Sequence, residues 1–82
     1  IMFLSLKNIK NKIADYLLRH LSSPDASTVK LSDTQQEIAD RFGVTRPSLA
    51  RAFAEMEQEG IISIDRKTIT INRLQQLRQI AK

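Results

Sequence analysis

Apolar residues recur at three- and four-residue steps through the first quarter of the chain. This stripe consists of Leu6, Ile9, Ile13, Tyr16, Leu17 and Leu21. Because such spacing puts side chains on one face of a helix, the pattern predicts an amphipathic helix over residues 6–21. Residues 22–28 are rich in Ser, Pro and Asp, which predicts a loop. The alternation Val29-Lys30-Leu31 then predicts a very short strand.

Two short helices separated by a tight turn are predicted next. Thr34 and Glu37 form a capping box at the start of the first helix, and Gly43 fits its end, where a left-handed residue is common. Thr45 is placed to cap the second helix, over about residues 45–59, with Pro47 in its first turn, where a missing N–H costs nothing. The residues expected to face inward are Ile38, Ala39, Phe42, Leu49, Ala52, Phe53 and Met56.

The last part of the chain changes to a period of two. Residues 61–64 and 67–71 are rich in β-branched residues that alternate with polar ones, and Asp65-Arg66 supplies a turn, so a β-hairpin is predicted. Residues 73–81 predict a short final helix. The order of elements predicts a fold that is mainly α with a small β-hairpin, namely a winged helix-turn-helix.

The composition narrows the classes of function. The chain has 82 residues, of which 41% are hydrophobic and 27% charged, as in one small globular domain. It has no Cys and a single His, which argues against a zinc site, and its two Gly cannot form a P-loop. Its longest apolar run is far too short to cross a membrane. The residues form no nucleophile–base pair and no carboxylate cluster at catalytic spacing, so we expect neither an enzyme nor a bound metal or cofactor.

The charge points to a polyanionic partner. Lys and Arg number 13 against 9 Asp and Glu, which gives a net charge of +4. The positive residues of the second short helix lie at its start, where Arg46, Ser48 and Arg51 could contact bases in a DNA major groove. Glu55, Glu57 and Glu59 occupy its later turns and would be repelled by phosphates, so its N-terminal half is the half expected to face DNA.

Phosphate contacts are expected on both sides of this helix. Thr34, Gln35 and Gln36 lie at the start of the preceding helix, where free backbone N–H groups favour an anion, and Thr45 occupies the same place on the second helix. Arg66 and Lys67, at the hairpin tip, could reach the DNA backbone. Contacts of this kind position a protein on DNA without reading its sequence.

In combination these motifs resemble the C-terminal DNA-binding domain of the cyclic-AMP receptor protein/FNR family of bacterial transcription regulators. The resemblance is carried by residues 34–39, 43–51, Met56, 60–62 and 67–69, and residues 3–6 and 13–18 look like the family's hinge and first helix. In that family the positions matching Arg46 and Arg51 contact bases, and the position matching Thr34 contacts phosphate. This chain departs from the family at Pro47, where Glu is frequent, and at Arg66, where the wing tip often has Gly.

The resemblance also implies a domain organisation and partners. Residues 1–5 would be the stub of an upstream dimerisation helix and hinge, residues 6–82 the DNA-binding domain, and an N-terminal sensor domain with an unknown effector would be absent. The implied partners are a pseudo-palindromic DNA duplex, a second copy of the protein and, as a further candidate, RNA polymerase. We expect a cytoplasmic protein that does not contact membranes.

A second interpretation stays open. A winged helix can serve as a protein-interaction module without DNA contact, and both the acidic run over residues 55–59 and the apolar residues 1–4 favour that alternative. Binding to duplex DNA that weakens with salt would separate the two.

Overall fold

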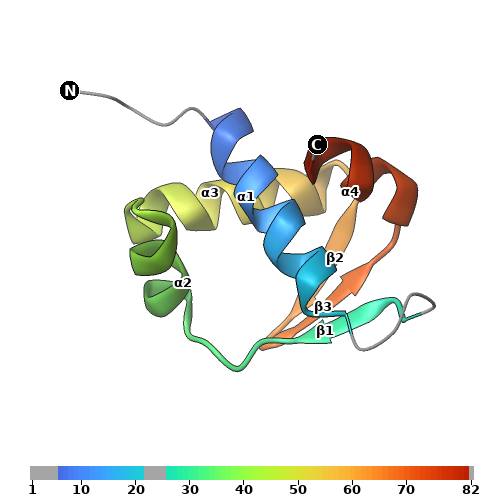
Figure 1. The fold of residues 1–82 in the computed structure, drawn as a ribbon, viewed down its shortest axis with the longest axis horizontal. Coiled ribbons are helices and arrows are strands. Elements are labelled where there is room, and N and C mark those ends of the chain that lie inside the picture. Colours follow the sequence, from blue (N-terminus) through green and yellow to red (C-terminus); the bar gives the residue numbers. More distant parts are fainter. Residues whose placement is uncertain (1–5, 22–25, 82) are drawn as a thin grey trace.

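The structure is a computed structural model that describes residues 6–21 and 26–81. Its elements, in chain order, are α1 (Leu6–Arg19), β1 (Thr28–Lys30), α2 (Gln35–Phe42), α3 (Arg46–Gln58), β2 (Ile62–Asp65), β3 (Thr68–Ile71) and α4 (Leu74–Ala81). Helix α1 packs against both α3 and α4. In Figure 1, α2 and the sheet lie on opposite sides of α1. The fold is the predicted winged helix-turn-helix.

The three strands form one antiparallel sheet in the order β1-β3-β2. The hairpin predicted from the alternating pattern is present, with Ile64 opposite Ile69. The predicted short strand adds to it, with Val29 opposite Ile69 on the other side. Strand β3 is therefore central, and β2 is an edge strand.

A single core joins the helices to the sheet. The apolar stripe of α1 contributes Ile9, Ile13, Tyr16 and Leu17, all buried, and Leu77 is the buried residue of α4. The inward faces of α2 and α3 contribute Ile38, Ala39, Leu49, Ala52, Phe53 and Met56, as the spacing predicts. Phe42 is only half-buried and packs at the edge of this core. Burial of these side chains, at about 25 cal/mol per Å² of apolar surface, is what holds elements this short together.

Some predicted boundaries were wrong. Helix α1 ends at Arg19 and not at residue 21, and β1 covers residues 28–30 in place of 29–31. The turn of the hairpin consists of Arg66 and Lys67, because Asp65 still pairs with Thr68 in the sheet. The stub predicted at residues 1–5 lies outside the residues that the structure describes.

Candidate nucleic-acid interface

The turn between α2 and α3 has the geometry that its sequence predicts. The Glu37 backbone N–H donates to Thr34 Oγ1 and the Thr34 N–H donates to Glu37 Oε1, each at 3.1 Å, so the capping box is complete. Gly43 ends α2 with φ 71°, a left-handed conformation that costs glycine little. Leu49 is fully buried, and α2 packs directly on α3.

The start of α3 is held by its own cap. The Ser48 N–H donates to Thr45 Oγ1 at 3.3 Å, and the Thr45 hydroxyl donates to Ser48 Oγ at 2.9 Å. Ser48 is half-buried, and Thr45 is exposed. One acceptor site of the Ser48 hydroxyl is thus already occupied by the cap, which makes Ser48 the least available of the three residues predicted to contact bases.

Both arginines of the leading half of α3 are exposed, but they point in different directions. Arg46 and Arg51 are five residues apart, and at about 100° per residue their side chains leave the helix about 140° apart. Arg46 faces α2 and the sheet, where it lines a cleft, whereas Arg51 is not among the residues of that cleft. The two predicted base-contacting arginines therefore lie on opposite flanks of the exposed face.

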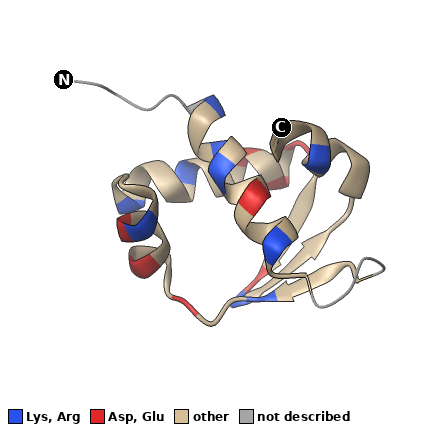
Figure 2. Cartoon of the chain, viewed as in Figure 1, with Lys and Arg blue, Asp and Glu red and all other residues tan. Residues whose placement is uncertain are grey.

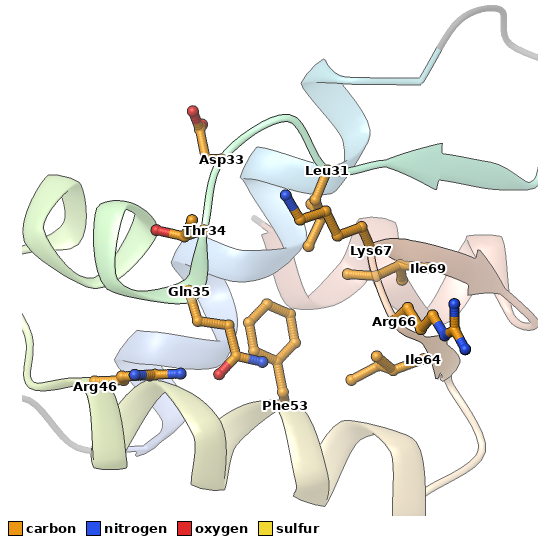
Figure 3. Close-up of a pocket in the computed structure, with 10 residues that line it drawn as sticks. All are labelled: Leu31, Asp33, Thr34, Gln35, Arg46, Phe53, Ile64, Arg66, Lys67 and Ile69. Carbon is orange, nitrogen blue, oxygen red and sulfur yellow. The ribbon is translucent and has the colours of Figure 1, made fainter.

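A cleft of about 160 Å³ lies between α2, α3 and the β2–β3 hairpin. Figure 3 shows the Phe53 ring at its centre, between Arg46 and Ile64, with Lys67 over Leu31 at the rim. Leu31, Phe53, Ile64 and Ile69 provide the apolar lining, and Asp33, Thr34, Gln35, Arg46, Arg66 and Lys67 provide the polar and charged lining. The cleft thus brings together five of the nine predicted contact residues.

The predicted phosphate contacts differ in environment. Gln36 is exposed, and its Nε2 donates to Asp40 Oδ1 at 3.0 Å within α2. Gln35 is half-buried at the cleft, next to the exposed Thr34. Arg66 and Lys67 are exposed at the tip of the β2–β3 hairpin. We call this hairpin the wing. Arg66 has φ 57°, a left-handed conformation that is strained for a residue with a side chain.

Two glutamates of the acidic run are engaged with α1. Lys10 Nζ lies 3.0 Å from Glu55 Oε1 and 2.7 Å from Glu59 Oε1. The hydrogen bond to Glu59, supported by the one to Glu55, raises the pKa of Lys10 although partial burial opposes the shift. In Figure 2 the acidic part of α3 lies behind α1. The sequence gives little sign of these ion pairs, because Lys10 is far along the chain from both glutamates.

The third glutamate points the other way. Glu57 Oε2 accepts a hydrogen bond from the Ile64 backbone N–H of β2 at 3.1 Å. Every member of the acidic run therefore has a partner within the domain. The acidic run, which was one of the two features favouring an interaction module, thus makes contacts inside the domain while its side chains stay partly exposed.

A polar network at the start of α2 also escaped the sequence analysis. The Tyr16 hydroxyl donates to Asp33 Oδ2 at 2.9 Å, and Arg41 Nη2 lies 3.5 Å from the same oxygen. Burial of the phenol, with the nearby Asp33 carboxylate, raises the pKa of Tyr16 to about 12. The His20 ring stacks on Tyr16. The network ties α1 to the residue that precedes the Thr34 cap.

Other kinds of site find little support in the part of the chain that the structure describes. Among residues 6–21 and 26–81 no three His, Asp or Glu side chains come close enough to share a metal ion. Within the same ranges, no helix has both the length and the apolar character that a bilayer span requires.

Comparison with known proteins agrees with this architecture. The family described as the Crp-like helix-turn-helix domain matches residues 11–80. The chain belongs to the Crp-like helix-turn-helix family. Membership makes this a DNA-binding domain of the type found in transcription regulators, and not an enzyme. No curated protein matches the sequence.

Solved structures of Crp-type regulators share the fold. DNR from Pseudomonas aeruginosa superposes with a TM-score of 0.80 at 25% identity over 92% of this chain and 34% of its own. A transcriptional regulator of the CRP family from Thermus thermophilus gives 0.73 at 28% identity, over 89% of this chain and 40% of its own. The CO-dependent transcription factor CooA from Carboxydothermus hydrogenoformans gives 0.78 at 22%, over 94% and 38%. This Crp-like domain thus spans less than half the length of each.

Proposed function

We propose that this domain binds duplex DNA sequence-specifically, with α3 in the major groove. The observation that carries the proposal is the division of α3: its leading half presents Arg46 and Arg51 to solvent, while the three glutamates at its other end, which include the C-cap Glu59, are engaged within the domain. Arginine donates two hydrogen bonds to guanine O6 and N7, so two exposed arginines in the leading turns suit base reading. Ser48 is proposed as a third, weaker contact.

Phosphate contacts are proposed to flank the groove. Four predicted phosphate contacts, Thr34, Gln35, Arg66 and Lys67, line one cleft together with the proposed base contact Arg46, which concentrates positive charge between the helix and the wing. Thr34 and Thr45 cap helices whose first N–H groups and dipoles favour an anion. Gln36, exposed in the first turn of α2, completes this set.

The domain is further proposed to act as the output part of a longer, dimeric regulator. The length comparison supports this, because the chain covers between 34% and 40% of three solved regulators. Two copies would place their α3 helices about 34 Å apart, in successive major grooves of a pseudo-palindromic site. An effector would then be sensed outside this chain, and a cytoplasmic location and contact with RNA polymerase belong to the same proposal.

Binding-site selection from random duplexes, followed by titration of the selected site, tests the base contacts. Arg51→Ala should lower affinity for that site by about 1–3 kcal/mol and relax the preference at one base pair, with little effect on random DNA. Arg78→Ala provides the matched control, since Arg78 is an exposed arginine on α4. Arg51→Ala that changes neither affinity nor preference would reject the proposal.

A further inference from the structure

The wing is attached to α3 through the open edge of its sheet. Strand β2 pairs with β3 on one side only, since the strand order is β1-β3-β2. In a two-residue hairpin the pair next to the turn, Asp65 and Thr68, exchanges hydrogen bonds, so the N–H of the preceding Ile64 points away from β3. That N–H is the group that donates to Glu57 Oε2 at 3.1 Å.

We infer that Glu57 is a positioning residue that fixes the wing against α3. Arg66 and Lys67 follow Ile64 by two and three residues, so holding the Ile64 backbone limits where both cations lie relative to Arg46 across the cleft. The inference rests on the proposed DNA binding, and it concerns a residue that itself touches no DNA. Glu57 acts through the backbone of β2.

The direction of Glu57 on the helix supports this role. Glu55 and Glu59 are four residues apart and share the flank that faces Lys10, whereas Glu57, between them, faces the wing. The acidic run therefore anchors α3 on two sides, to α1 through Lys10 and to the wing through Glu57. Glutamine at position 57 would keep an oxygen that can accept the Ile64 N–H, while alanine would leave that N–H to water.

Comparison of E57A with E57Q separates the hydrogen bond from the charge. E57A should lower affinity for the selected duplex about three- to tenfold, as expected for one lost hydrogen bond, and should reduce the slope of log affinity against log salt by up to about one. E57Q should bind at least as tightly as the wild type, because it keeps the acceptor and removes a negative charge near phosphates. Lys10→Met, which breaks the other anchor, should leave the salt slope unchanged.

A double variant tests whether Glu57 works through the wing. If it does, E57A in a Lys67→Ala background should cost less than in the wild type, since one of the two contacts it positions is already gone. Fully additive losses, or E57Q behaving like E57A, would overturn the inference.

The wing anchor can also be tested without DNA. The Ile64 amide should exchange faster with solvent in E57A but stay protected in E57Q; an unchanged exchange rate of the Ile64 amide in E57A would overturn the inference. Failure of the wild-type protein to bind any duplex would instead reject the proposed function, and the Ile64 amide would still show whether Glu57 holds the wing.

Discussion

Two turns border the proposed DNA-binding face, and each contains a residue in the left-handed conformation. Between α2 and α3 this residue is Gly43, with φ 71°; at the wing tip it is Arg66, with φ 57°. Glycine takes this conformation at little cost, whereas a residue with a side chain loses roughly 1 kcal/mol. The helix-turn-helix therefore has glycine at the position where the backbone is left-handed, whereas the wing has an arginine there.

This difference indicates what each turn contributes. The side chain of Arg66 adds a cation at the rim of the cleft, where Arg46 and Lys67 also lie, at the expense of backbone strain. A retained strain of this kind is typical of positions where the side chain serves binding. Gly43 has no side chain to offer, so its contribution is limited to the crossing of α2 and α3.

The largest effect is expected from placing a side chain on the first turn. Gly43→Ala should lower the free energy of unfolding by about 1–2 kcal/mol, through backbone strain alone, because an added Cβ meets no atom within 4 Å. Gly43→Asn should cost less, since asparagine tolerates the left-handed region. Urea denaturation of both variants provides the measurement. Equal losses would show that the left-handed conformation is not what Gly43 supplies.

A second prediction concerns the network that holds the start of α2. Tyr16→Phe removes the hydrogen bond to Asp33 and should cost about 1 kcal/mol at pH 7. The folded-state pKa of Tyr16, about 12, exceeds the ordinary value of 10.0, so between these pH values the unfolded chain loses a proton that the folded chain keeps. The contribution of Tyr16 to the free energy of unfolding is therefore fully present below pH 10 and is lost as the pH rises from 10 to 12.

Tyr16→Phe should be less sensitive to this pH range than the wild type. The pKa of Lys10 is also raised, so the loss of its proton at high pH lowers the stability of both proteins alike. The difference between their plots of unfolding free energy against pH therefore isolates Tyr16. Curves that stay parallel from pH 9 to pH 12 would contradict a raised pKa of Tyr16.

The smallest effect is expected at the wing and has the opposite sign. Arg66→Gly should raise the free energy of unfolding by about 0.5–1 kcal/mol, because glycine relieves the strain but has a more flexible unfolded state. The same variant should bind duplex DNA more weakly, with a salt slope smaller by about one. Thermal unfolding measures the gain in stability, and a salt titration of DNA binding measures the loss of affinity. A variant that is more stable and binds DNA equally well would leave Arg66 without a role in binding.

Features encoded within a few residues could be predicted from the sequence. Thr34, Gly43 and Thr45 each specify a helix end through a contact with a residue at most four positions away, and all three adopt the expected geometry. The buried positions of α2 and α3 followed from the helical period in the same way. The predicted strand ahead of α2 also exists, but nothing local showed that it would pair with β3.

Contacts between distant segments account for what was missed. Lys10 meets Glu59 across 49 positions, and Tyr16 meets Asp33 across 17, so neither pair leaves a local pattern. The different directions of Arg46 and Arg51 could have been derived from their five-residue spacing. Glu57 could likewise have been separated from Glu55 and Glu59 by helical geometry, although its partner is a backbone N–H, which no sequence pattern marks.

The pairing of β1 with β3 also bears on the proposed contacts with the DNA backbone. The Leu31 N–H donates to the Lys67 carbonyl at 2.7 Å, and Thr34 follows Leu31 by only three residues. This hydrogen bond therefore links the wing turn, which contains Lys67, to the short segment that leads to the Thr34 cap. Two proposed phosphate contacts linked in this way would favour duplexes whose phosphate spacing matches theirs, which would make DNA shape part of the proposed recognition.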